Sequence, residues 1–228
     1  MPWRRPGSIL IGLLVLSLAA SGREAPRPVQ VPLDAGQLAA LYWEPPKSLA
    51  PAVLLVHMLG RSKEDWIPLA TRLRRDGYAV LAIDLREQGR SNREQLIADL
   101  RAGFNFLREQ KKVDAARIGL IGASIGANTA LAFAAAEPLV RLAVLLSPGL
   151  NYRGVTTEPA LRDYGVRPLL LVAAEEDLGS AAALRRLAGA AQGKAVAKLY
   201  PGAAHGTEMF AAGLPLTQDI LAFLKTYL

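Results

Sequence analysis

The stretch Gly122-Ala123-Ser124-Ile125-Gly126 joins a short apolar run, 118–122, to an alanine-rich run, 125–135. The first run suits a buried strand and the second a helix, because alanine has the highest helix propensity. G-x-S-x-G at such a junction is typical of a sharp turn that exposes a serine hydroxyl at the start of a helix. Gly122 and Gly126 leave room for the turn, and the helix N-terminus favours negative charge beside Ser124. The pattern predicts a nucleophilic Ser124; the alternative is a glycine-rich connection without chemistry.

On both sides of this turn, short continuous apolar runs alternate with longer amphipathic runs. The apolar runs predict strands buried on both faces, over 52–57, 79–84, 118–122, 142–146, 169–173 and 195–200. The amphipathic runs predict helices over 66–76, 95–109, 125–135, 180–190 and 215–228. Because parallel strands need crossover connections, the fold class is α/β, a mostly parallel sheet with helices on both faces.

The segments outside this alternation predict one edge of the sheet and the lengths of its connections. Runs 29–33 and 37–43 flank the turn signal Asp34-Ala35-Gly36, which predicts an antiparallel hairpin at a sheet edge. The segment 146–169 lacks a clear helix. The connections between strands are too short for a large lid domain.

A serine hydroxyl needs a base, and the chain has two histidines. His205 follows the last predicted strand, so it is expected at the carboxyl edge of the sheet and is the predicted base. His57 ends the first buried strand, and its expected role is structural, with its ring bracing a loop. Asp177 follows the fifth buried strand and is the predicted acid that orients the imidazole, with Glu175 and Glu176 as rivals.

The chain order of Ser124, Asp177 and His205 is serine, acid, histidine. From residue 29 onward the sequence resembles the α/β-hydrolase superfamily, and most of all its small, lidless group of dienelactone-hydrolase-like proteins and esterases. Dienelactone hydrolases proper have cysteine at the turn where Ser124 stands, so the resemblance does not imply their particular activity.

The resemblance also implies an oxyanion hole, a pair of backbone N–H groups that hold a developing negative oxygen. By position these are the amides of Leu59 and Ile125. The sequence His57-Met58-Leu59-Gly60 departs from the superfamily pattern, because Met58 stands where glycine is usual. Met58 is a candidate to narrow the acyl side of a pocket.

Other residues near the predicted edge have weaker signals. Asp84, in a loop that resembles a common superfamily loop, is expected to be structural. Trp66 and Tyr152 are expected to pack in the core or in loops, with a place lining a pocket as the alternative. Three arginines are expected to be solvated surface side chains, with binding of a substrate carboxylate as the alternative: Arg61, Arg86 and Arg90.

Composition excludes several classes of protein. Of the 228 residues, 51% are hydrophobic and 21% charged, as in an ordinary globular domain. With no cysteine and two histidines, the chain has no disulfides, thiolate zinc sites or iron–sulfur clusters, and little material for an imidazole metal site. We expect no metal and no organic cofactor. The arginines are scattered without interleaved aromatic residues, so nucleic acid is not an expected partner.

The N-terminus has the pattern of a secretory signal peptide. Arg4 and Arg5 precede an apolar run, 9–20, that ends in small residues and is too short to span a bilayer comfortably. We predict a leader over 1–22, a linker over 23–28 and one domain over 29–228; the alternative is an uncleaved membrane anchor. The protein is then exported, periplasmic or extracellular, and touches a membrane only if the leader remains. Without Arg4 and Arg5 the net charge of +7 becomes a mild +5.

Together, the motifs and the resemblance imply an exported serine hydrolase of small or medium carboxylic or thio esters. Three alternatives remain open: a peptidase of the same fold, an acyltransferase, and a non-catalytic binding protein. The residues do not identify the substrate or the oligomeric state.

Overall fold

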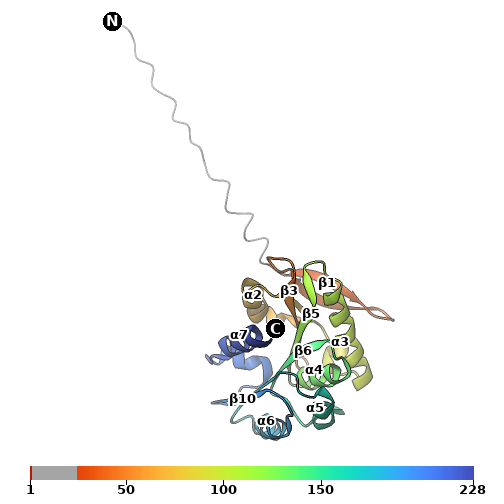
Figure 1. Cartoon of the computed structure of the whole chain (residues 1–228), viewed down its shortest axis with the longest axis vertical. Coiled ribbons are helices and arrows are strands. Elements are labelled where there is room, and N and C mark those ends of the chain that lie inside the picture. Colours follow the sequence, from red (N-terminus) through yellow and green to blue (C-terminus); the bar gives the residue numbers. More distant parts are fainter. Residues whose placement is uncertain (2–24) are drawn as a thin grey trace.

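The computed structural model describes residue 1 and residues 25–228 (Figure 1). The predicted leader lies outside the described residues apart from Met1, and so do residues 23 and 24 of the predicted linker. Within the described part, no helix has both the length and the apolar character to cross a membrane.

An eight-stranded sheet forms the centre of the domain, in the order β1-β2-β4-β3-β5-β6-β9-β10. Its strands are β1 Arg27–Pro32, β2 Gln37–Trp43, β3 Ala50–Val56, β4 Ala79–Ile83, β5 Val113–Ala123, β6 Val140–Leu146, β9 Leu169–Ala174 and β10 Ala195–Tyr200. The strands from β3 to β10 run parallel, while β2 pairs antiparallel with β1 and β4. The predicted α/β class and N-terminal edge hairpin are therefore confirmed, and β1 begins at Arg27 rather than at the predicted residue 29.

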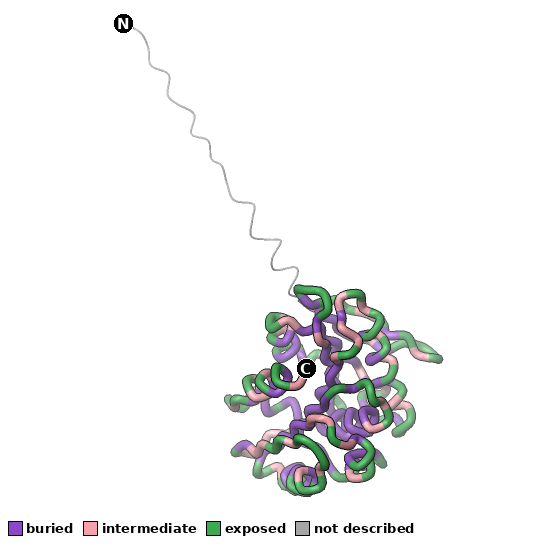
Figure 2. The backbone as a smooth tube through the Cα atoms, in the orientation of Figure 1, coloured by how far each residue is buried: buried purple, intermediate pink, exposed green. Residues whose placement is uncertain are grey.

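Helices cover both faces of the sheet, as predicted (Figure 1). Their bounds are α2 Ile67–Arg75, α3 Arg93–Arg108, α4 Ile125–Ala136, α5 Glu158–Tyr164, α6 Leu178–Ala190 and α7 Leu216–Tyr227. Three short 3₁₀ turns join them: η1 Lys63–Trp66, η2 Arg86–Gly89 and η3 Gly206–Ala211. One apolar cluster packs α3, α4, α5 and α6 on one face, and a second packs α2 and α7 on the other. The central strands are buried between these layers, and exposed residues gather on the outer turns (Figure 2).

Several local features differ from the sequence prediction. Strand β5 begins at Val113 and not at residue 118, and α6 begins at Leu178 and not at residue 180. Helix α3 begins two residues earlier than expected, because the side chain of Asn92 accepts the Gln95 N–H and the Gln95 side chain accepts the Asn92 N–H. The segment 146–169, expected to lack a clear helix, contains α5 and a two-stranded hairpin, β7 Asn151–Tyr152 and β8 Val155–Thr156. The buried Asn128 side chain holds this segment through the Val155 carbonyl and the Gly149 N–H.

Candidate active site

Ser124 lies on a strained turn at the carboxyl end of β5. Its φ of 53° and ψ of −118° are unusual for a residue with a side chain, and its N–H donates to the carbonyl of Leu146 at 2.8 Å. A Cβ at Gly122 would lie 2.3 Å from the Gly126 oxygen, and one at Gly126 would lie 2.4 Å from the Val56 oxygen. Both contacts are with backbone atoms, so the two glycines are sterically required for the turn.

The turn leads directly into α4, whose first residue is Ile125. The Ser124 carbonyl accepts the N–H groups of Ala127 and Asn128, at 2.9 and 3.1 Å, which closes the first helical turn. The Ile125 N–H has no acceptor inside the helix, because the first N–H groups of an α-helix never do. It is therefore a free donor beside Ser124, and its role in an oxyanion hole stays a prediction.

The structure brings His205 and Asp177 into direct contact. The distance from His205 Nδ1 to Asp177 Oδ2 is 2.7 Å, and the Asp177 side chain is 16% exposed. The rivals Glu175 and Glu176 are exposed at the same edge, and within the described part of the chain neither carboxylate forms a hydrogen bond or an ion pair with His205. Asp177 is thus the acid whose geometry fits the base.

The base loop also lies against the serine turn. A Cβ at Gly206, the residue after His205, would lie 3.4 Å from the Cβ of Ala123, the residue before Ser124. Among the described residues no hydrogen bond joins Ser124 to His205. The three predicted residues therefore lie at the carboxyl ends of β5, β9 and β10, and His205 is hydrogen-bonded to Asp177.

Two serines that the sequence analysis did not single out surround Asp177. Burial by itself raises the pKa of the Asp177 carboxyl, but hydrogen bonds from His205, Ser180 and Ser147 outweigh burial and set the pKa below its usual value. Ser147 is fully buried at a φ of 49°, and its Oγ accepts the Gly206 N–H at 2.9 Å. Ser180 Oγ lies 3.3 Å from the Tyr152 hydroxyl. Ser147 follows a predicted strand directly, and that position was the available signal.

His57 has the structural role expected of it. Its Nδ1 donates to the Met58 carbonyl at 2.8 Å, and its Nε2 accepts the Leu85 N–H at 2.9 Å. Burial lowers the pKa of His57, which keeps the ring neutral in this arrangement. With both nitrogens occupied, His57 joins the loops after β3 and β4 and is not free to act as a base.

Leu59, the other predicted oxyanion donor, lies on the loop after β3. The next residue, Gly60, donates its N–H to the Gln88 carbonyl at 3.0 Å. A Cβ at Gly89 would lie 3.4 Å from Ile125 Cγ2 and 3.8 Å from Leu59 Cα, so η2 contacts both predicted donors. Among the described residues, the Leu59 N–H donates to no hydrogen bond.

The three candidate arginines differ in their partners. Arg86 pairs with the buried Asp99 at 2.6 Å, so its role is structural. Arg61 Nη2 lies 3.1 Å from Glu208 Oε1, and Arg90 donates to the Gln88 side chain at 2.8 Å. None of these contacts shows a carboxylate-binding role.

The contacts and burial of the other candidate residues show what each side chain does. Asp84 accepts both the backbone N–H and the Nζ of Lys63, at 2.8 and 2.6 Å, as expected of a structural residue. Trp66 is fully buried, which confirms core packing and not a place in a pocket wall. Tyr152 is half-buried beside Ser180. Among residues 25–228, no three His, Cys, Asp or Glu side chains are grouped so that they could hold a metal ion.

Comparison with known proteins identifies the family. The family model described as the alpha/beta hydrolase fold matches residues 51–188, which include the serine turn and Asp177. The chain belongs to the α/β-hydrolase family. The predicted resemblance is therefore confirmed at the level of the family.

Individual relatives of this α/β hydrolase match less of it. The thiohydrolase AneE of Aspergillus aculeatus is 33% identical over 107 residues, 43% of this chain and 34% of that protein. The chain spans about a third of the length of the curated relatives it matches.

Solved structures match almost the whole domain. A dienelactone hydrolase from Anabaena variabilis has a TM-score of 0.75 at 22% identity, over 90% of this chain and 99% of that one. A carboxylesterase cloned from a metagenomic library has a TM-score of 0.67 at 24% identity, over 88% and 87%. At these identities the likeness shows the fold alone.

Proposed function

We propose that this α/β hydrolase is a serine hydrolase of small or medium carboxylic or thio esters. The observation that carries the proposal is the strained Ser124 turn at the same sheet edge as the His205–Asp177 pair, 2.7 Å apart. A strained serine at the head of a helix, with a carboxylate-bound imidazole on neighbouring strand ends, is the arrangement that nucleophilic acyl transfer needs.

The mechanism has two halves. In the first, His205 takes the Ser124 hydroxyl proton, Ser124 Oγ attacks the ester carbonyl, and the Leu59 and Ile125 amides bind the oxyanion. His205 then gives the proton to the leaving alcohol or thiol, which departs and leaves an acyl-enzyme. In the second half His205 deprotonates water, which attacks the acyl carbon, and the proton returns to Ser124 as the carboxylic acid leaves. Asp177 stays ionised throughout and holds the imidazole in place.

The choice of esters rests on the relatives and on the plain sheet-and-helix architecture of the described residues. The matched relatives and structures include a thiohydrolase and a carboxylesterase. Within residues 25–228 the sheet has no added cap or propeller that would hold a peptide chain. A peptidase, an acyltransferase and a non-catalytic binding protein are therefore outcomes of the test rather than the proposal.

The test compares the purified protein with its Ser124→Ala variant on p-nitrophenyl esters of increasing acyl length, one thioester and one aminoacyl amide. We expect Ser124→Ala to lose at least about 10³-fold in kcat with little change in Tm. The matched control is Ser48→Ala, an exposed serine in the turn before β3, at the opposite end of the strand from the site.

Each outcome separates the alternatives. Ester turnover that survives Ser124→Ala would overturn the mechanism. Aminoacyl-amide turnover above ester turnover would favour a peptidase, and product formed only with an added alcohol acceptor would favour an acyltransferase. A folded protein without turnover or fluorophosphonate labelling would favour a binding protein.

We also propose that the protein is exported through the predicted leader, residues 1–22. The charged start, short apolar run and small-residue end support this proposal. Fractionation of cells that express the full chain, with the mass of the recovered protein, tests it: recovery of the uncleaved chain in the cytoplasm would overturn it.

A further inference from the structure

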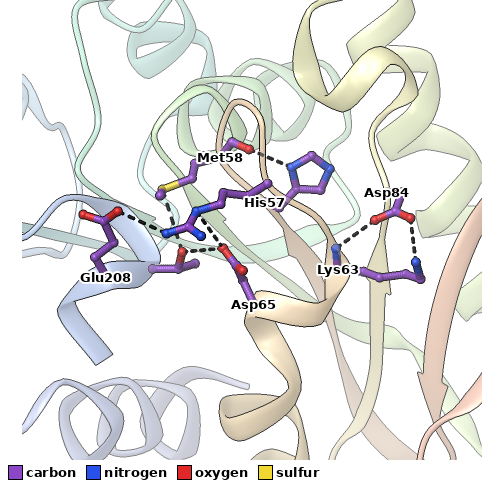
Figure 3. Close-up of polar contacts among 8 residues, drawn as sticks. His57, Met58, Lys63, Asp65, Asp84 and Glu208 are labelled. Atoms are coloured by element: carbon purple, nitrogen blue, oxygen red, sulfur yellow. Dashed lines mark hydrogen bonds and ion pairs between the residues drawn. The ribbon is translucent and has the colours of Figure 1, made fainter. Parts of the chain in front are cut away.

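Two loops of the candidate site pack against each other, although they are about 150 residues apart in the chain. The oxyanion loop, residues 57–61, follows β3 and carries Leu59. The base loop, residues 205–208, follows β10 and carries His205. Figure 3 shows the polar contacts that surround the oxyanion loop and reach Glu208 of the base loop.

Met58 forms the apolar part of this contact. Its side chain is 7% exposed, and a Cβ at Gly206 would lie 2.6 Å from its sulfur. Gly206 has a φ of +57°, so both its conformation and its packing against Met58 favour glycine. The Met58 side chain therefore packs against the base loop, and its role in narrowing the pocket stays a prediction.

Thr207 forms the polar part. Its Oγ1 donates to Asp65 Oδ2 at 2.9 Å and lies 3.7 Å from Met58 Sδ. Thr207 is 8% exposed and the Asp65 side chain 22%, so this hydrogen bond is partly buried. Asp65 belongs to η1, the turn that follows the oxyanion loop, and Arg61 Nε lies 3.6 Å from the same carboxylate oxygen.

The base loop needs such an anchor because of where it begins. β10 is an edge strand with one neighbour, β9, and most of its residues are exposed or half-buried. On the β6 and β9 side the loop is held by Ser147 and Asp177. On the β3 side the loop is held by Met58 and Thr207, which are buried, and by the ion pair of Arg61 with Glu208, whose side chains are 45% and 51% exposed.

We propose that Met58, Thr207 and Asp65 form an inter-loop clamp that positions His205 relative to the oxyanion donors, with Thr207 as its central positioning residue. The proposal rests on the proposed function, because it assigns the clamp a role in the same reaction. Thr207 touches no reacting atom and acts through the placement of the base loop.

The first test compares Thr207→Val, which removes the hydroxyl at nearly constant volume, with Thr207→Ser, which keeps it. We expect Thr207→Val to lower kcat about 10- to 100-fold, as a misplaced catalytic group does, with KM changed less than about 3-fold. Thr207→Ser is expected to retain most of the parent kcat. The matched control is Thr226→Val, which deletes a hydroxyl on the exposed face of α7. If Thr207 had only a structural role, Thr207→Val would lower Tm. It would not lower kcat while leaving KM nearly unchanged, and Thr207→Ser would not restore kcat.

The second test is a double-mutant cycle with Asp65→Ala. If Thr207 and Asp65 act through one hydrogen bond, the double variant loses no more kcat than the worse single variant. Losses that multiply would overturn the clamp, and so would a Thr207→Val variant with the parent's kcat or a Thr207→Ser variant as impaired as Thr207→Val.

The third test is independent of turnover. Amide hydrogen exchange of residues 58–61 and 205–211 should become faster in Thr207→Val, in both loops together, and stay at the parent rate in Thr207→Ser. If the parent shows no Ser124-dependent turnover, the proposed function fails and this exchange measurement alone decides the clamp. Unchanged exchange in Thr207→Val would overturn it.

Discussion

At the scale of single residues, the site depends on positions where the backbone leaves no room for a side chain. Gly126 is the clearest, since a Cβ there would lie 2.4 Å from the Val56 oxygen and 2.5 Å from the His57 oxygen. Neither oxygen can rotate away, because both belong to the backbone that leads into the oxyanion loop.

We therefore predict that Gly126→Ala lowers the free energy of unfolding by more than about 2 kcal/mol and abolishes turnover. Gly179→Ala is the matched control. Gly179 lies in α6 with nothing within 4 Å of an added Cβ, so the same substitution should raise stability by about 0.5–1 kcal/mol. Urea denaturation of the three proteins checks both values, and equal stability of the parent and Gly126→Ala would contradict the steric argument.

Asp177 should make stability depend on pH in a specific direction. Because its folded pKa is lowered, its ionised form stabilises the fold above the ordinary aspartate pKa of about 3.9. That contribution is lost as the pH falls through the lower folded pKa.

The measurement is the free energy of unfolding of the parent and of Asp177→Asn between pH 6 and about pH 2.5. We expect the difference between the two proteins to be largest at pH 6 and to shrink as the solution becomes more acidic. A difference that grows on acidification would contradict the assigned direction of the pKa.

At the scale of elements, periodicity predicted the buried strands and the long helices, because their apolar residues recur over enough positions to outweigh local effects. It could not predict α5 or the β7–β8 hairpin. Segments of seven and two residues carry too little periodicity, and tertiary contacts such as those of the buried Asn128 hold them in place.

Arg167 shows how an element is held by a residue that no pattern identifies. Its guanidinium donates to the carbonyls of Ala134, Glu137 and Val140, at 2.6, 3.0 and 2.9 Å, and stacks on the Tyr164 ring. It thereby caps the end of α4 with a positive charge, where the helix dipole favours one.

We predict that Arg167→Met lowers the free energy of unfolding by about 2–3 kcal/mol. Arg167→Lys keeps the charge but not the planar guanidinium, so it should lower the free energy of unfolding by a smaller amount. Turnover of the folded variants should equal that of the parent, because Arg167 precedes β9 at the sheet edge opposite the site. Denaturation and ester hydrolysis measured on the same samples test both statements. A kcat that falls with stability would show that α4 transmits the change to Ser124.

At the scale of the whole molecule, the sequence predicted which strand ends carry Ser124, Asp177 and His205, because parallel strands bring their carboxyl ends to one edge. It did not predict Ser147, Thr207 or the buried side of Met58. These residues form contacts between segments that are 59 to 149 residues apart in the chain. The spacing of residues within one strand, helix or turn does not predict contacts at such separations.

The segments that surround the carboxyl ends of the strands also decide how a substrate reaches the site. The main insertion near it, between β6 and β9, is fixed by buried hydrogen bonds of Asn128 and by Thr157, whose hydroxyl donates to the Gly149 carbonyl at 2.8 Å. An insertion tied down in this way is not free to act as a lid that opens on an aggregated substrate. We therefore expect the rate on a p-nitrophenyl ester to saturate smoothly as its concentration passes through the solubility limit. A sharp rise in rate at that limit, absent from Ser124→Ala, would show that part of this edge does move and would contradict the prediction.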